Sequence, residues 1–182
     1  MKLLEVQPLT AEKFAPFGDV IEASDKVNHF TINDGFTERY HDLALVDSGQ
    51  NNGHTGISIF RSTPLQRPIA IKMMERHPQG SQAFMPLGTV GEEARVGKEG
   101  KEGKEPYLVV VAPKGDFDIE KLAVFIAQPH QGVNYHRGTW HHYCLALNCV
   151  SDFLVVDRIA NDGVSENNCD VIELDGSLVI NF

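Results

Sequence analysis

Asn134-Tyr135-His136-Arg137-Gly138-Thr139-Trp140-His141-His142 places three imidazoles and one guanidinium around a single glycine. Glycine permits a tight turn, and polar side chains gathered at such a turn are suited to chemistry more than to packing. We therefore interpret this stretch as a turn at an active site. His141, which begins the chain's return after the turn, marks that site.

Length and charge restrict the class of protein. With 182 residues, the chain is expected to form one domain, residues 1–182, with a single core. Its 25 acidic and 16 basic residues give a net charge of -9, which argues against binding to nucleic acid or to an anionic membrane and favours a small-molecule partner. An odd number of cysteines speaks against a disulfide framework, and no secretion signal or membrane anchor is recognisable at the N-terminus, so we expect a cytoplasmic location.

Short runs of branched apolar residues recur between turn residues along the chain and predict strands. Helical signals are few: Thr10 could cap a short helix through Ala15, and Asp118 could cap one turn. Many strands with one or two short helices predict an all-β sandwich or barrel. The predicted strands are 43–46, 56–60, 69–74, 107–112, 124–127, 143–147, 153–157 and 178–180.

One segment, residues 88–106, cannot contribute to a core because it repeats Gly-Lys-Glu and has no aromatic residue. Charges of both signs and a glycine at every third position predict a flexible surface loop between two strands. A lid over the site is the alternative, since the loop follows the strand that carries candidate ligands.

Two motifs resemble those of the cupins. The spacing His136-x-Gly138-x-x-His141 is similar to the second cupin motif, with histidine in place of the usual proline. The resemblance implies a cupin-like β-barrel or jelly roll in which His141 points into the barrel and holds a metal or a substrate.

The first cupin motif has a degenerate counterpart after the apolar run at 69–74. Glu75 and His77 are two residues apart, so in an extended strand their side chains share one face. Together with Gln82 they occupy the ligand positions of the motif. We predict that Glu75, His77, Gln82 and His141 hold a divalent metal, with Ni²⁺ or Mn²⁺ favoured over Zn²⁺ by the oxygen donors. In the alternative, Glu75 pairs with Arg76 or another base and His77 caps a turn.

Longer stretches resemble the ureidoglycolate lyases. They are Ile32-Asn33-Asp34-Gly35 with Glu38 to Ala44, Glu75-Arg76-His77-Pro78 through Pro86, Gln131 to His136 with Trp140-His141-His142, and 152–158 with Asn168-Cys169-Asp170. The resemblance spans nearly the whole chain, and the 88–106 segment is its main departure. It implies a homodimeric cupin-like enzyme of allantoin (purine) degradation that cleaves (S)-ureidoglycolate to glyoxylate and urea.

That reaction needs a base for the hydroxyl proton, an acid for the departing nitrogen and an anchor for the substrate carboxylate. No electrons are transferred, and the chain has no Gly-x-Gly-x-x-Gly or P-loop pattern, so we expect no nucleotide cofactor. A divalent metal would take over part of the work of a strong base.

The predicted proton carriers are histidines and a tyrosine. We assign His136 as the base and His41 or Tyr40 as the acid. The alternatives are that His136 bonds the backbone of its own turn and that His41 closes a turn with Asp42. His142 directly follows His141, and successive side chains of a strand point to opposite faces, so we expect His142 to face outward or into a subunit contact.

The predicted substrate-binding residues are Arg39, Arg137 and Asn134. A guanidinium can grip a carboxylate with two hydrogen bonds, although either arginine could instead pair with an acid at the rim. Two other functions remain open: a hydrolase releasing ammonia and carbon dioxide, and a non-catalytic sensor of small carboxylates. The density of His and Tyr favours catalysis.

Overall fold

Strands make up most of the protein in the computed structural model, which describes residues 2–49, 53–89, 106–160 and 168–181. The all-β prediction is confirmed. In chain order the elements are β1 (Lys2–Leu4), β2 (Val6–Pro8), α1 (Ala11–Phe14), β3 (Gly18–Ile21), β4 (His29–Ile32), η1 (Asn33–Gly35), β5 (Thr37–Tyr40), β6 (His54–Ser62), β7 (Ile69–Arg76), β8 (Gln82–Thr89), β9 (Tyr107–Ala112), η3 (Ile119–Lys121), β10 (Ala123–Ala127), β11 (Gly132–Tyr135), β12 (Trp140–His141), β13 (Leu145–Ala146), β14 (Ser151–Ile159) and β15 (Asp170–Ile180).

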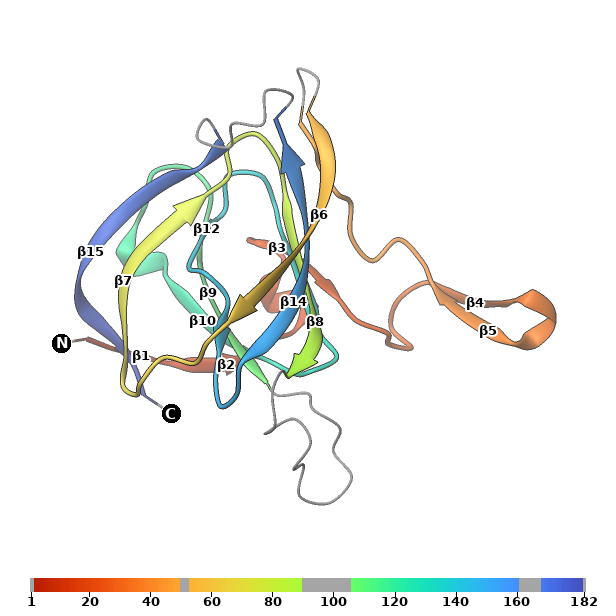
Figure 1. Cartoon of the computed structure of the whole chain (residues 1–182), viewed down its shortest axis with the longest axis horizontal. Helices are drawn as coiled ribbons and strands as arrows, with labels where there is room; N and C mark the ends of the chain where they lie inside the picture. Colours follow the sequence, from red (N-terminus) through yellow and green to blue (C-terminus); the bar gives the residue numbers. More distant parts are fainter. Residues whose placement is uncertain (1, 50–52, 90–105, 161–167, 182) are drawn as a thin grey trace.

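Two sheets form the body of the molecule. The eight-stranded sheet has the order β1-β15-β7-β12-β9-β10-β2, with β13 also paired to β9. The five-stranded sheet has the order β3-β11-β8-β14-β6. The larger sheet curls so that β7 and β15 lie across from β9 and β10, and the smaller sheet packs on the other side of β9 and β10 (Figure 1). The result is the expected cupin-like β-barrel.

The central strand β9 contributes to two cores because all six of its residues are buried. Tyr107, Val109 and Val111 pack with Phe84 and Phe153 of the smaller sheet, and this is the first core, between the two sheets. The alternate residues of β9 pack into a second core inside the curl of the larger sheet. A strand covered on both faces reads as a continuous apolar run, since neither face meets water.

Both predicted helical turns are present. Thr10 caps α1, with its Oγ1 accepting a hydrogen bond from the Lys13 backbone N at 3.3 Å. Asp118 caps η3 in the same way through the Glu120 N, at 3.0 Å. Each cap satisfies a backbone N–H that has no partner in the first turn of a helix.

A hairpin of β4 and β5 projects away from the barrel (Figure 1). Three consecutive residues at its tip, Asn33, Asp34 and Gly35, have positive φ values, which Asn, Asp and Gly tolerate better than other residues. This hairpin was not among the predicted strands.

The predicted strand at 43–46 is wrong. These residues have no strand structure and instead run over the smaller sheet, where the Leu45 carbonyl accepts a hydrogen bond from Asn134 Nδ2 at 3.2 Å. Leu45 itself is 81% exposed, so the apolar run reflects a surface segment and not a core strand. Of the predicted loop at 88–106, residues 90–105 lie outside the described residues, and β8 extends through Thr89.

Candidate functional site

Glu75, His77 and His141 come together at one end of the first core, and we call them the inner cluster. His141 in β12 is the direct neighbour of Glu75 in β7. One ligand atom from each of the three residues lies within 4.8 Å of the others. The Gly138 N donates to the His77 carbonyl at 3.0 Å, which ties the turn before β12 to the end of β7. Two segments about sixty residues apart thus meet as the sequence led us to expect.

Both histidines of the inner cluster have their tautomer set by a backbone carbonyl. His77 Nδ1 lies 2.7 Å from the Asn168 carbonyl oxygen, and His141 Nδ1 lies 3.0 Å from that of Thr139. A carbonyl only accepts, so each Nδ1 carries a proton, and in the neutral imidazole each Nε2 then has a lone pair. Histidines that bind metals are oriented in this way in proteins.

Buried polar atoms without a hydrogen-bond partner gather among the predicted ligands. Six buried side-chain N and O atoms of the described residues have none: three are on predicted ligands (His77 Nε2, His141 Nε2 and Gln82 Oε1), and the others are Asn134 Oδ1, His142 Nε2 and Arg158 Nε. Gln82 begins β8, and its Nε2 donates to Asp157 Oδ2 at 3.2 Å, which leaves the amide oxygen unused. Burying such an atom without a partner costs free energy. A cation bound by these lone pairs would remove that cost, so the donor set fits a divalent metal.

The charges of the inner cluster also fit a cation. His141 Nε2 lies 3.5 Å from Glu75 Oε1, and this contact lowers the pKa of Glu75, whereas burial acts to raise it. Burial lowers the pKa of His77, so this imidazole is neutral at pH 7. Glu75 thus brings a negative charge to the cluster, and the nearby Asp157 carboxylate acts to raise the pKa of His77, against the effect of burial. An anionic substrate would be repelled there unless a cation intervened.

The alternative for Glu75 and His77 is not what the structure shows. Arg76 pairs with Asp170, from Nε to Oδ2 at 2.8 Å, and its guanidinium lies over the Trp140 ring, 4.5 Å from the centroid. Because successive residues of a strand point to opposite faces, Arg76 faces away from both of its neighbours. Glu75 therefore has no ion pair with Arg76, and its carboxylate lies with the histidines of the inner cluster.

His142 is placed differently from the expectation. It is 1% exposed and does not face outward, and burial lowers its pKa. The Tyr143 carbonyl lies 3.0 Å from its Nδ1, while its Nε2 has no partner. Strand β12 ends at His141, so the alternation used to place His142 does not extend to it.

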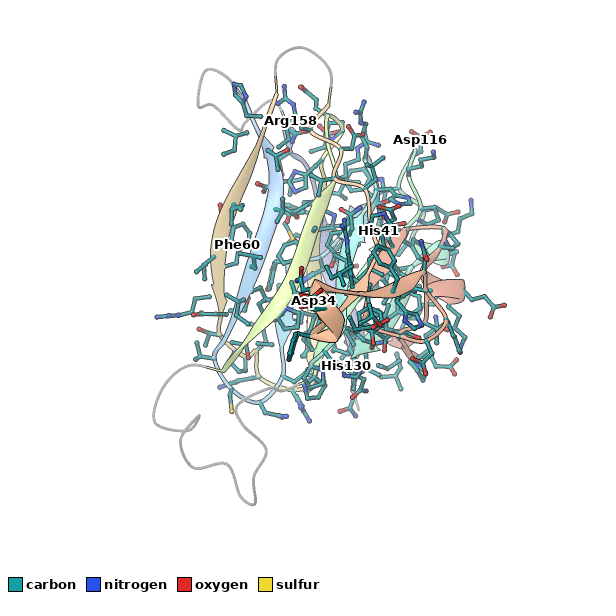
Figure 2. The ribbon with its side chains drawn as sticks, turned by 90° about the vertical axis from the view of Figure 1, so that its right-hand side faces the viewer. Asp34, His41, Phe60, Asp116, His130 and Arg158 are labelled. Carbon is teal, nitrogen blue, oxygen red and sulfur yellow. The ribbon has the colours of Figure 1, made fainter. Side chains whose placement is uncertain are left out.

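The predicted proton carriers lie elsewhere, on the outer face of the smaller sheet. His136 follows Tyr135 of the first core and points to the opposite face, where its Nε2 contacts Asp19 Oδ1 at 3.0 Å. His41 lies at the base of the hairpin (Figure 2), with its Nε2 3.2 Å from Asp42 Oδ2. We call His41 and His136, with Tyr40, the outer cluster. The structure does not bring these residues to Glu75.

Two cavities adjoin the outer cluster, and His41 lines both. One, of about 410 Å³, lies between the base of the hairpin, with Arg39 and Tyr40, and apolar residues of the smaller sheet such as Met85 and Leu154. The other, of about 560 Å³, includes His136. The predicted acid and base thus share a surface with each other but not with the predicted metal ligands.

The predicted substrate-binding residues also have partners on that outer face. Arg137 grips the Asp47 carboxylate with two hydrogen bonds of 2.9 and 2.6 Å, which lowers the pKa of Asp47. Asn134 is fully buried and donates to Asp19 Oδ2 at 2.9 Å. The Arg39 guanidinium lies over the Phe30 ring in the hairpin. Arg137 therefore follows the alternative of pairing with an acid, whereas Arg39 lies over an aromatic ring instead.

Residues that the sequence analysis did not assign to the site contact the inner cluster. The Tyr135 ring stacks on His141 with centroids 4.3 Å apart, and Cys169 Sγ lies 3.8 Å from Glu75 Oε2. Asn168 and Asp157 contact His77 and Gln82 as described above. Tyr135 lies two residues after the buried Val133, so its side chain projects from the same face of β11, and it pairs with Gln82 on β8. The alternation of β11 could therefore have predicted that Tyr135 faces the site. No local sequence pattern predicts that Asn168 and Cys169 lie next to the end of β7.

The comparisons with known proteins all match this chain to proteins of one description. A family model described as ureidoglycolate lyase matches residues 1–181. A ureidoglycolate lyase of Burkholderia cepacia is 46% identical over 180 residues, which is 99% of this chain and 91% of that protein. Ureidoglycolate lyases of Pseudomonas syringae pv. tomato and Pseudomonas aeruginosa are 49% and 48% identical over 171 residues, 93% of this chain and 89% of each relative. Within the described ranges, no helix is long and apolar enough to cross a membrane.

Proposed function

The chain belongs to the ureidoglycolate lyase family, and we propose that its inner cluster is where the substrate is cleaved. It is an enzyme, a lyase that acts on ureidoglycolate. The observation that carries the proposed location is the meeting of the ionised Glu75 with His77 and His141, whose buried Nε2 atoms have no hydrogen-bond partner. Such a gathering is costly unless a ligand uses it.

A divalent metal fits this donor set, and Glu75, His77, Gln82 and His141 would hold it. Two imidazole nitrogens with two oxygens suit Ni²⁺ or Mn²⁺. A divalent ion held there supplies a Lewis acid, which lowers the pKa of a hydroxyl group and offsets developing negative charge. The carbonyls of Asn168 and Thr139 keep both Nε2 lone pairs directed to the site by holding the protons on Nδ1.

The reaction proposed is elimination of urea from (S)-ureidoglycolate. The hydroxyl of the substrate loses its proton, its oxygen forms the carbonyl of glyoxylate, the carbon–nitrogen bond breaks and the nitrogen gains a proton. Oxidation states do not change, so a nucleotide cofactor has no part in the balance. His136 as base, with His41 or Tyr40 as acid, and Arg39, Arg137 and Asn134 as substrate-binding residues, stay predictions. The inner cluster alone supports the site proposed here.

Product analysis tests the proposed reaction. Purified protein would be given racemic ureidoglycolate before chelator treatment, after it, and after addition of Ni²⁺ or Mn²⁺, with glyoxylate, urea and ammonia measured together and a protein-free control. We expect equal amounts of urea and glyoxylate, loss of activity with chelator and recovery with metal. Ammonia without urea would instead identify a hydrolase. Full activity of protein shown to be free of metal would overturn the metal proposal.

We also propose that the enzyme is a homodimer formed through the outer face of the smaller sheet and the hairpin. Phe36 at the tip of the hairpin is 91% exposed, and Ile57 and Ile59 of β6 are 72% and 62% exposed. A two-stranded hairpin has little stability of its own, so a second copy packed on it would supply the burial that it lacks. Light scattering of the wild type and of Phe36→Asp tests this, and a monomeric wild type would overturn it.

The proposed cellular role is in allantoin (purine) degradation in the cytoplasm. The cysteines, all within the described residues, form no disulfide, which agrees with a reducing compartment. Growth of the source organism on allantoin as sole nitrogen source, with and without the gene, tests the pathway.

A further inference from the structure

Three consecutive residues that lead into β15, Asn168 to Asp170, contact the last two residues of β7 and the residue directly after it. Asn168 contacts His77, Cys169 contacts Glu75, and Asp170 contacts Arg76. The antiparallel pairing of β15 with β7 places the two segments side by side, with Asp170 opposite Arg76. We call residues 168–170 the clasp.

Asn168 contacts the chain around His77 twice. Its backbone carbonyl accepts from His77 Nδ1 at 2.7 Å, and its side-chain Oδ1 accepts from the Gln79 backbone N at 2.7 Å. The side chain therefore holds the Asn168 backbone against the turn after His77, so that the carbonyl stays within reach of the imidazole. Asn168 is 8% exposed, so water offers little competition for these bonds.

Cys169 contacts the carboxylate of the inner cluster. Its Sγ lies 3.8 Å from Glu75 Oε2, and the thiol acts as a weak donor to that oxygen. The other oxygen, Oε1, is the one that lies 3.5 Å from His141 Nε2. Contact with the thiol thus leaves Oε1 turned toward the histidines.

We propose that two residues of the clasp position the site, with Asn168 setting the tautomer and direction of His77 and Cys169 setting the direction of the Glu75 carboxylate. This inference rests on the proposed function of the inner cluster as a metal site. Asp170 holds Arg76, which faces away, and has no part in the positioning. Neither Asn168 nor Cys169 touches substrate in this proposal, so they are positioning residues and not catalytic ones.

The test reads the His77 tautomer directly. Long-range ¹H–¹⁵N NMR distinguishes a proton on Nδ1 from one on Nε2, and it needs neither metal nor substrate. In metal-free wild type we expect the proton of His77 on Nδ1. In Asn168→Ala we expect a mixture of tautomers and a loss of Ni²⁺ affinity of about tenfold to a hundredfold by calorimetry, the usual range for removing such a support. Asn168→Asp keeps the acceptor for the Gln79 N and should retain the Nδ1–H tautomer.

Matched variants complete the test. Cys169→Ala should weaken Ni²⁺ binding, and Cys169→Ser, which keeps a donor, should restore most of it. Asp170→Ala removes the ion pair that the same segment makes on the other face and should leave Ni²⁺ affinity unchanged. Circular dichroism confirms that each variant is folded.

The outcomes separate this inference from the function on which it rests. If folded Asn168→Ala keeps the Nδ1–H tautomer and wild-type Ni²⁺ affinity, the positioning role is overturned even though the metal site stands. If the tautomer changes in Asn168→Ala but wild type binds no Ni²⁺, the positioning role is supported and the metal proposal falls.

Discussion

The inner and outer clusters contain the same kinds of side chain in opposite surroundings. His141 of the inner cluster is 1% exposed and has an Nε2 without a hydrogen-bond partner. The His136 side chain of the outer cluster is 49% exposed, and its Nε2 already contacts Asp19. A buried lone pair without a partner is a cost that a ligand can remove, whereas an exposed imidazole paired with a carboxylate has no such need. The comparison teaches that the surroundings of a histidine, not its residue type alone, distinguish the two clusters.

His141→Ala gives the largest effect expected from this comparison. It removes one nitrogen of the inner cluster, and since Lewis-acid assistance is worth several kcal/mol, kcat should fall by roughly a thousandfold or more. Glyoxylate release measures this, with calorimetry for loss of Ni²⁺ binding. Circular dichroism should show an unchanged fold. Normal turnover by this variant would show that the inner cluster is not the site of cleavage.

His136→Asn is the matched change in the outer cluster. If the inner cluster carries the reaction, kcat should fall by less than about tenfold, below the usual contribution of a general base. The same glyoxylate assay measures it. A loss as large as that of His141→Ala would restore His136 as the base and would require the two clusters to act together.

The stability of the metal-free enzyme should depend on the inner histidines at mildly acidic pH. Burial places the pKa values of His77 and His142 below 6.5, so below that pH the unfolded chain binds protons that the folded protein does not. Stability present above pH 6.5 is therefore lost as the pH falls from 7 to 5. Urea denaturation at several pH values measures this. His77→Asn should reduce the slope, and His136→Asn, at an exposed position, serves as the comparison.

Arg137→Met should have the smallest effect. The Arg137 and Asp47 side chains are each 39% exposed, and exposed ion pairs contribute less than about 1 kcal/mol because water screens them. We expect a slightly lower free energy of unfolding and an unchanged KM. A KM raised more than about tenfold with an unchanged kcat would show that Arg137 leaves Asp47 to bind the substrate carboxylate.

The sequence predicted much of the fold because its signals are local. Alternation and branched residues indicated β7, β9, β10 and β14, and capping residues indicated both helical turns. The hairpin was missed because β4 and β5 have no core face and consist of exposed residues with little apolar alternation. The run at 43–46 was mistaken for a strand because apolar composition alone does not distinguish a covering segment from a buried one.

What the sequence by itself determined is the ligand pair of the first motif, since Glu75 and His77, two residues apart in an extended segment, project to the same face. Only the tertiary structure decided that His141 joins them, that His136 turns to the opposite face of its sheet, and that Asn168 and Cys169 close on β7. The physical reason is that the face of a strand from which a side chain projects depends only on its position relative to neighbouring residues. Which faces meet is set by the pairing of strands far apart in the chain, and for β15 with β7 no local signal records that pairing.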